Sequence, residues 1–280
     1  MAKALVITEK PSVARDIVGV LGGFTECDGY FESDTHVVTF AVGHLFELLS
    51  PEEIDDKYKR WTLDALPIIP SEFRLKPKKG HSERIRTIGK LLKRRDIKEV
   101  VNACDSGREG ELIFREIIEY FASEKPIRRL WLQSMTDRAV RKGFEELRSG
   151  EDLQGLAAAA ACRARSDWLI GMNATRAFTK RLKSRKEKTA WSAGRVQTPT
   201  LAMLVERLRA AKLGFAMCGV KGQVMAVMER THLLDKIGLE NLYPDTKSAV
   251  DDIVTKVHTN TDLPVKGCKN CPLTEYIPAS

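Results

Sequence analysis

Hydrophobic and polar positions in the first 150 residues follow two different periods. Short apolar runs of strand length lie at residues 4–8, 30–33, 36–42, 99–103 and 129–133. Stretches in which apolar residues recur every third or fourth position lie between them, at residues 11–21, 82–95, 108–120 and 139–147. The second spacing predicts helices. Strands that alternate with helices are typical of a layered α/β domain with a mostly parallel sheet.

The pattern changes near Ser149-Gly150. Residues 153–183 are rich in Ala, lack Pro and keep apolar side chains at helical spacing, which predicts one or two helices, and a further helix is expected around residues 199–211. Residues 51–80, rich in Pro and Lys, are predicted to form a long ordered loop. We therefore divide the sequence into an α/β domain at 1–150, a mainly helical segment at 151–212 and a divergent tail at 213–280.

Composition narrows the class of protein. Hydrophobic residues make up 43% of the 280 and charged residues 30%, which is ordinary for a folded chain and excludes global disorder and a fibrous protein. No apolar stretch reaches the roughly 18 residues that a membrane span needs. The first apolar run meets an acid at Glu9, so it predicts a buried strand and not a signal peptide. We expect a soluble, cytoplasmic protein.

Residues 176–195 form a strongly basic interval. The formal net charge of the chain is +8, and residues 176–195 hold eight Lys or Arg against one acid, Glu187. Trp191 lies inside this interval, where an aromatic ring among cations suits stacking on an unpaired base. A solvated basic loop between helices is the structural alternative.

Two acidic motifs lie where a predicted strand ends and a helix begins. One is Asp105-Ser106-Gly107-Arg108-Glu109-Gly110-Glu111 and the other is Glu9-Lys10-Pro11-Ser12. Ligands bind at the carboxyl ends of parallel strands, and grouped carboxylates there suit Mg²⁺. An acid beside a lysine suits a proton donor with a phosphate anchor. The alternatives are an acidic helix N-terminus that complements the helix dipole and a solvated ion pair.

Four motifs in a fixed order resemble a known family. They are Thr8-Glu9-Lys10-Pro11-Ser12, Gly43-His44-Leu45, Asp105-x-x-Arg108-Glu109-Gly110-Glu111 and the run from Ser192 to Leu201 (SAGRVQTPTL). This order resembles the type IA DNA topoisomerases, and among them bacterial topoisomerase III, over about residues 1–206. The resemblance implies a Toprim metal-binding domain and ATP-independent cleavage, passage and rejoining of DNA strands.

The resemblance implies a role for each matching residue. Glu9 matches the glutamate that protonates the leaving 3′ oxygen and contributes to the metal site, and Asp105 and Glu109 match the acids that hold Mg²⁺. Gly107 stands where the family commonly has a second Asp, so one candidate ligand is missing. Arg195 would neutralise the scissile phosphate as a catalytic residue. The expected DNA-binding residues are Lys10, Arg108, Ser192, Ala193, Gly194, Arg195, Val196 and Gln197.

His44 keeps two interpretations: a contact with DNA near the site, or a histidine that caps a strand end. Glu111 receives no role beyond support of the motif.

The family's nucleophile is a tyrosine that becomes covalently joined to the 5′ phosphate, and the pattern that should contain it fades after Glu206. The segment Tyr243-Pro244-Asp245-Thr246-Lys247-Ser248 keeps four residues of the family's motif but replaces its Arg by Asp and its Asp by Lys. An Asp beside a DNA phosphate repels it. Our hypothesis is a truncated, rearranged or frameshifted enzyme with an unrelated tail.

The tail also holds Cys268 and Cys271, half of a tetrahedral zinc site, with His258 as the nearest further ligand. We interpret the pair as two free thiols.

The sequence therefore predicts a type IA topoisomerase that takes Mg²⁺ and acts on single-stranded or negatively supercoiled DNA in a bacterial cytoplasm, associated with the nucleoid or a plasmid. Two alternatives stay open. One is a non-catalytic single-stranded DNA-binding remnant. The other is a Toprim phosphoryl-transfer enzyme, a primase or nuclease, which needs no tyrosine.

Overall fold

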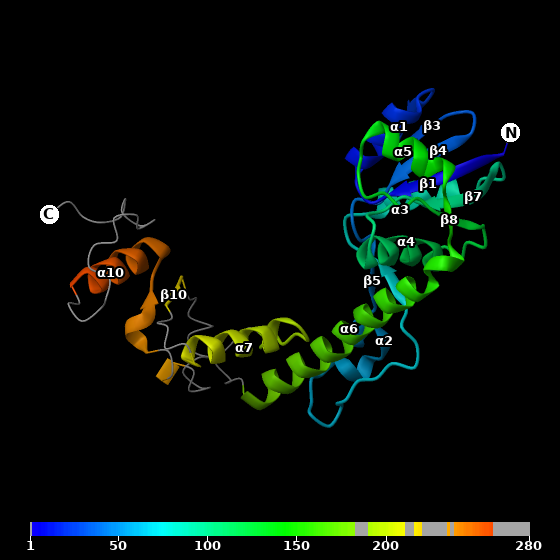
Figure 1. The fold of residues 1–280 in the computed structure, drawn as a ribbon. Coiled ribbons are helices and arrows are strands. Elements are labelled where there is room, and N and C mark those ends of the chain that lie inside the picture. Colours follow the sequence, from blue (N-terminus) through cyan, green and yellow to red (C-terminus); the bar gives the residue numbers. More distant parts are fainter. Residues whose placement is uncertain (1, 183–189, 211–215, 220–233, 236–237, 260–280) are drawn as a thin grey trace. The chain divides into compact units, whose positions relative to one another are not determined.

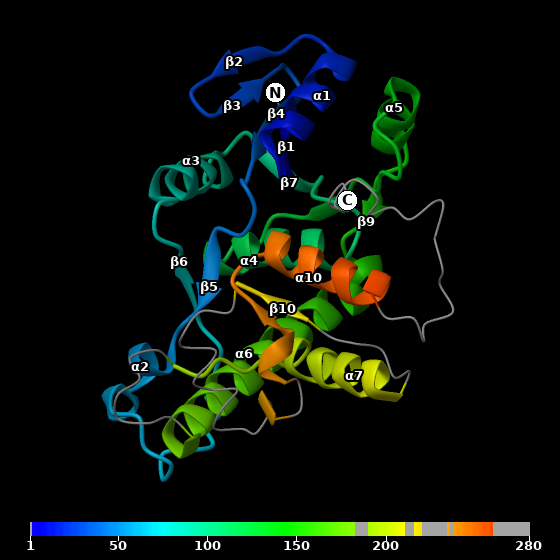
Figure 2. The same ribbon diagram turned by 90° about the vertical axis from the view of Figure 1, so that its left-hand side faces the viewer.

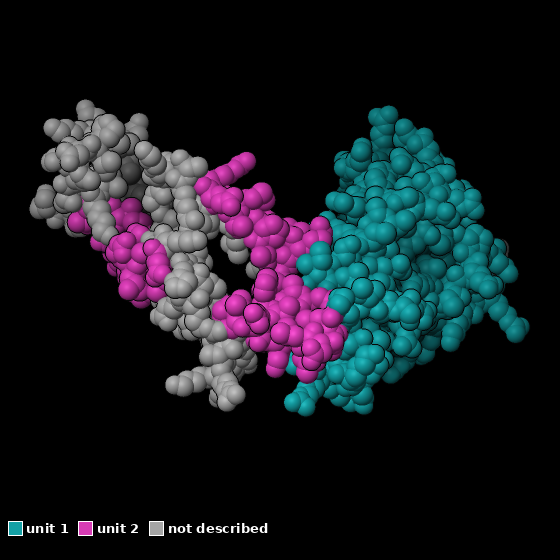
Figure 3. All heavy atoms as spheres, turned by 90° about the horizontal axis from the view of Figure 1, so that it is seen from below, with its two compact units in different colours: residues 1–61, 67–172 teal, residues 62–66, 173–280 magenta. Residues whose placement is uncertain are grey.

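The computed structural model describes residues 2–182, 190–210, 216–219, 234–235 and 238–259. The chain separates into two compact units (Figure 3). The first contains residues 1–61 and 67–172, and the second contains residues 62–66 and 173–280. The domain division expected from the sequence stays a prediction.

The first unit is built on a seven-stranded sheet in the order β2-β3-β4-β1-β7-β8-β9 (Figure 1). Its central strands β4 (His36–Phe40), β1 (Lys3–Thr8), β7 (Ile97–Asn102) and β8 (Ile127–Arg129) are parallel to one another. Antiparallel strands complete the two edges: β2 (Thr25–Cys27), β3 (Tyr30–Glu32) and β9 (Arg148–Ser149). The predicted α/β class with a mostly parallel sheet is confirmed.

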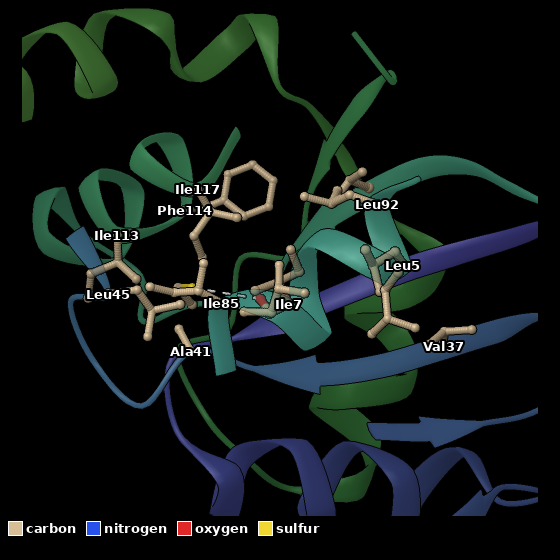
Figure 4. Packing of buried hydrophobic residues seen from close by; sticks show 14 of the residues in the cluster. Leu5, Ile7, Val37, Ala41, Leu45, Ile85, Leu92, Ile113, Phe114 and Ile117 are labelled. Carbon is tan, nitrogen blue, oxygen red and sulfur yellow. Dashed lines mark hydrogen bonds between the residues drawn. The ribbon is translucent and has the colours of Figure 1, made fainter. Parts of the chain in front are cut away.

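Helices cover both faces of this sheet. Successive side chains of β1 point to opposite faces, and those on each face pack against different helices. Leu5 and Ile7 pack on one face against α3 (Ser82–Leu92) and α4 (Arg108–Tyr120), in the cluster drawn in Figure 4. Ala4 and Val6 pack on the other face against α1 (Pro11–Leu21) and α5 (Asp137–Glu145). A strand buried on both faces has a continuous apolar sequence, which is why residues 4–8 were recognisable.

Two expectations need correction. Residues 51–80 are not a single loop: they contain α2 (Pro51–Ile54), a 3-10 helix (Asp56–Lys59) and β6 (Leu75–Pro77). β6 pairs with β5 (Phe46–Leu48). This pairing joins distant residues, so no local sequence pattern indicates it. The predicted strand at 129–133 lies earlier, at Ile127–Arg129, because there it pairs with both β7 and β9.

The Ala-rich segment forms one continuous helix, α6 (Gln154–Leu182), preceded by a 3-10 turn (Glu151–Leu153). Within the first unit, Trp168 of α6 is buried, donates to the Leu49 carbonyl at 2.9 Å and meets Phe73 edge to face.

The second unit contains α7 (Gln197–Ala210), a parallel pair β10 (Met217–Cys218) and β11 (Leu242–Tyr243), a 3-10 turn (Leu239–Asn241), and α10 (Thr246–Thr259). Among the residues that the structure describes, no helix is both long and apolar enough to cross a membrane.

Candidate functional site

The candidate site is built from two strand–helix junctions, and the first of them joins β1 to α1. The Thr8 hydroxyl donates to the Lys10 carbonyl at 2.9 Å, and Pro11 opens the helix, where its missing N–H costs nothing. The amides of Val42 and Gly43, just after β4, donate to the Glu9 carbonyl at 2.8 and 3.2 Å. The ends of β1 and β4 are therefore fastened together at Glu9.

Val42, whose amide contributes to this link between β1 and β4, has an energetically unfavourable backbone conformation. Its φ is 67°, a left-handed value that a β-branched residue rarely adopts, and the side chain is 50% exposed. Such strain persists where the surrounding structure fixes it, commonly near functional sites. The sequence analysis did not single out Val42.

The second junction joins β7 to α4. Its shape depends on Gly110, because a Cβ there would lie 2.1 Å from the Asp105 carbonyl oxygen. The loop therefore folds directly onto the first turn of the helix. Gly107 differs: a Cβ there would meet nothing within 4 Å.

A buried arginine stabilises the loop between β7 and α4 through hydrogen bonds. Arg129 is 1% exposed, and its guanidinium donates to the carbonyls of Asn102, Cys104 and Asp105 at 2.9, 2.7 and 2.8 Å. The Glu111 carboxylate, also 1% exposed, lies 3.6 Å from Arg129 Nε. The available signal was an arginine that ends β8 directly before the apolar run Leu130-Trp131-Leu132.

Glu111 completes this buried network. Asn102 Nδ2 and Arg115 Nε donate to its two carboxylate oxygens at 2.9 and 2.8 Å. A buried carboxylate with these partners is a structural member of the motif, which agrees with the supporting role expected for it.

The structure brings Glu9, Lys10 and Asp105 together at the carboxyl edge of the sheet. Lys10 Nζ lies 2.9 Å from Asp105 Oδ2 and 3.8 Å from Glu9 Oε1. Partial burial raises the pKa of the Glu9 carboxyl, and the Asp105 charge raises it further. A carboxyl whose pKa is raised is better suited to act as a general acid than one with an ordinary pKa.

His44 links the site to α4. Its Nε2 lies 2.6 Å from Glu109 Oε1 and its Nδ1 lies 3.2 Å from Glu116 Oε2. The hydrogen bond to Glu116 is the largest cause of the raised pKa of the His44 imidazole. Burial of the ring acts in the opposite direction and lowers the pKa. The protonated ring donates to both carboxylates. The sequence analysis missed Glu116, because 72 residues separate it from His44.

The carboxylates do not form a closed metal cage. In the part of the chain that the structure describes, no three His, Cys, Asp or Glu side chains gather closely enough to ligate one ion. Asp105 pairs with Lys10, and Glu109 pairs with His44. This donor set fits Mg²⁺, which commonly takes one or two carboxylates and completes its shell with water and phosphate oxygens.

A cavity of about 460 Å³ opens beside Glu109 within the first unit. Its lining includes Arg108, Glu109, Glu116, Lys78 and Trp168. Arg108, expected to bind DNA, therefore borders a hollow next to the acidic residues.

The predicted segment from Ser192 to Gln197 belongs to the second unit. Its backbone is fastened to the end of α6, because Ala193 N donates to Thr175 Oγ1 at 3.0 Å and Trp191 N donates to Thr179 Oγ1 at 2.8 Å. Ser192 and Val196 are exposed, Gly194 and Arg195 are half-buried, and Ala193 is buried. The Gln197 side chain lies outside the described residues. DNA binding by this segment stays a prediction.

The segment at Tyr243 ends β11 and begins α10. The Tyr243 hydroxyl donates to the Asp252 carboxylate, and Ser248 N donates to Asp245 Oδ1 at 2.8 Å. Asp245, which replaces the family's arginine, therefore caps a helix. Cys268, Cys271 and the His258 side chain lie outside the described residues.

Two family models match the chain: the Toprim domain over residues 4–135 and the DNA topoisomerase model over residues 151–216. DNA topoisomerase 3 from Bacillus anthracis is 45% identical over 207 residues, which cover 74% of this chain and 28% of that protein. The enzyme of the same name from Bacillus cereus strain ATCC 14579 is 40% identical over 257 residues, covering 92% of this chain and 34% of that protein. The second alignment extends past the motifs that end near residue 206.

A solved structure shares the fold. Full-length topoisomerase I from Thermotoga maritima matches with a TM-score of 0.51 at 22% identity, covering 73% of this chain and 30% of that one. The chain spans about a third or less of the length of the relatives that it matches. On the order of its motifs, the two family models and these relatives, the chain resembles the type IA DNA topoisomerases, and among them topoisomerase III.

Proposed function

We propose that this chain carries the metal centre and part of the DNA groove of a type IA topoisomerase that resembles topoisomerase III. The proposed activity is Mg²⁺-dependent, ATP-independent cleavage and rejoining of one strand of single-stranded or negatively supercoiled DNA, in a bacterial cytoplasm near the nucleoid or a plasmid. The observation that carries the proposal is the convergence of Glu9, Lys10 and Asp105 from two adjacent parallel strands, with Glu109 on the helix that follows.

Each side chain has a role that its surroundings support. Glu9, with its raised pKa, donates the proton to the 3′ oxygen as that oxygen leaves. Lys10, whose side chain is 53% exposed, turns from Asp105 toward a DNA phosphate. Arg195 neutralises charge on the scissile phosphate.

Asp105 and Glu109 are the carboxylates proposed to hold Mg²⁺, with Glu9 near enough to contribute. The bound ion would supply positive charge to the phosphate oxygens. Lys10 pairs with Asp105 and His44 pairs with Glu109, so these two groups offset part of the negative charge of the acidic cluster.

The presence or absence of a nucleophilic tyrosine distinguishes strand cleavage from DNA binding alone. Tyr243 donates its hydroxyl to Asp252, and Asp245 beside it is acidic, which opposes a phosphate. This contact and the charge of Asp245 favour a second candidate function: single-stranded DNA binding without strand cleavage.

Relaxation of supercoiled plasmid with Mg²⁺ tests the proposed function, with SDS trapping of covalent protein–DNA adducts as a second readout. Relaxation and an adduct that disappear in Tyr243→Phe would assign that tyrosine as the nucleophile. Salt-dependent binding of single-stranded DNA without an adduct would support the second candidate. DNA hydrolysis or nucleotide incorporation that is lost in Glu9→Gln would contradict both and indicate a nuclease or primase.

A further inference from the structure

A second concentration of positive charge lies in the first unit, away from the acidic cluster. Residues 74–95 contain ten Lys or Arg and one acid, Glu83. This excess is larger than that of residues 176–195, which hold eight against one. The segment covers β6 and α3, both of which the structure describes in full.

Some of these cations form ion pairs or hydrogen bonds within the first unit. Lys76 pairs with Glu47 and Glu53, and Arg94 pairs with Glu32 and Asp96. Arg84 donates to the Gly29 carbonyl at 2.6 Å. These cations stabilise the fold and are not available to a ligand.

Three cations on α3 and at its C-cap remain turned to solvent. Arg86, Lys90 and Lys93 are exposed, and their spacing of four and then three residues places them on one face of the helix. Among the residues that the structure describes, no acid forms an ion pair with any of the three. Cations on one face without acidic partners leave their charge available to attract a polyanion.

The stripe borders a hollow that also contains an aromatic ring. A cavity of about 370 Å³ lies between α3, β6 and the end of α4, and its lining includes Arg86, Lys90, Lys93, Pro77 and Tyr120. Figure 2 shows α3 above β6 in the first unit. Tyr120 stacks on Phe46 with ring centroids 4.3 Å apart and is still 39% exposed. Cations beside an exposed aromatic ring suit a single-stranded nucleic acid, whose bases stack while its phosphates are neutralised.

This face is continuous with the acidic site along α4. Glu109 lies in the first turn of α4 and Tyr120 at its last residue, so 11 residues, or roughly 16 Å of helix, separate them. Lys78 lines the cavity beside Glu109, and its neighbour Pro77 lines the cavity beside Tyr120. The two hollows therefore have neighbouring lining residues at the end of β6.

We propose that Arg86, Lys90, Lys93 and Tyr120, with Pro77-Lys78, form a second contact surface for single-stranded DNA, which extends the path of the strand along α4 from the acidic site. The inference deepens the proposed function, because it gives the bound strand a route beyond the acidic cluster. It concerns binding only and requires neither a metal nor a nucleophile.

The test uses the full 280-residue chain and fluorescein-labelled dT30 in EDTA, so that no cleavage occurs. Anisotropy titrations between 50 and 200 mM NaCl compare wild type with Arg86→Gln/Lys90→Gln/Lys93→Gln. The matched control is Arg138→Gln/Arg141→Gln/Lys142→Gln on α5, three exposed cations whose removal changes the net charge equally. Because all six side chains are exposed, both variants should keep the wild-type circular dichroism melt.

The α3 variant is expected to bind dT30 about tenfold more weakly at 50 mM NaCl, with a salt slope smaller in magnitude by about 2, since each phosphate contact on a single strand contributes roughly 0.7. The α5 control should keep the wild-type slope. Tyr120→Ala should weaken binding at least about fivefold, while Tyr120→Phe keeps the ring and the affinity.

Equal losses in the α3 and α5 variants would overturn the proposal, because net charge alone would then explain them. Retention of dT30 binding with loss of a 30-base-pair duplex would also overturn it. Since the assay needs no catalysis, an inactive enzyme that still shows the α3 effect would contradict the proposed function and leave this inference supported.

Discussion

Gly110 is the residue whose replacement should most directly separate the shape of the acidic loop from its charge. A Cβ at this position would lie 2.1 Å from the Asp105 carbonyl oxygen and 2.8 Å from the Asp105 nitrogen. Ordinary contacts lie beyond 3.4 Å, so Gly110→Ala must open this loop by more than 1 Å. The opposing atoms are backbone, which cannot swing aside as the end of a side chain does.

The magnitude follows from two opposing effects. Overpacking costs about 1–3 kcal/mol, and a backbone clash belongs near the upper end of that range. Alanine inside a helix is more favourable than glycine by about 1 kcal/mol. We therefore expect a net loss of about 1–2 kcal/mol in the free energy of unfolding, measured by urea denaturation.

Gly107→Ala is the matched control within the same motif. Its Cβ meets nothing within 4 Å, and at this helix N-cap alanine is less favourable than glycine by under about 1 kcal/mol. Gly110→Ala should also weaken Mn²⁺ binding, because Asp105 is displaced, whereas Gly107→Ala should not. Equal metal affinity in both variants, together with equal stability, would refute this account of the loop.

Three further predictions concern the same site. Arg129→Met should cost about 3 kcal/mol or more, because the carbonyls of Asn102, Cys104 and Asp105 lose their buried donor; thermal and urea unfolding measure this, and a loss below 1 kcal/mol would contradict it. Gly107→Asp restores the carboxylate that the family commonly has at this position; there is room for it, so Mn²⁺ affinity should rise several-fold in an isothermal titration, and unchanged affinity would argue against an ion at this edge. Glu9→Gln should stabilise the protein at pH 7, since the raised pKa means that folding disfavours the ionised carboxyl. That gain should shrink as the pH falls through the raised pKa of Glu9, where the wild-type side chain becomes neutral as well; a gain that is constant from pH 7 to pH 4 would contradict the assigned cause.

The central strands and the positions of the acidic motifs were predictable because each leaves a local pattern. A strand buried on both faces, such as β1, has a continuous apolar sequence, and the amphipathic helices α1 and α4 begin and end as their spacing indicates. Once the strands are parallel, their carboxyl ends share one edge, which brings Glu9 near Asp105.

The remaining features depend on residues that are distant in sequence. The pairing of His44 with Glu116 joins positions 72 apart, and β5 and β6 are three-residue strands that exist because they pair with each other. The position of Arg129 below the Asp105 loop follows from the register of β8 on β7. No local period encodes such contacts, because packing of the whole sheet decides them.

The second basic surface illustrates a different limit. The charges of residues 74–95 are visible in the sequence, yet only the structure separates the cations paired inside the fold, such as Arg94, from those on the outer face of α3.

The central claim is that Asp105 and Glu109 form a divalent metal site at the carboxyl edge of the sheet, and Mn²⁺ binding followed by electron paramagnetic resonance tests it most directly. We predict a bound ion in the wild-type chain that is lost in Asp105→Asn/Glu109→Gln. It should be retained in Asp34→Asn/Glu26→Gln, a control that removes two exposed acids beside the β2–β3 edge. Equal Mn²⁺ binding by the two double variants would contradict the claim.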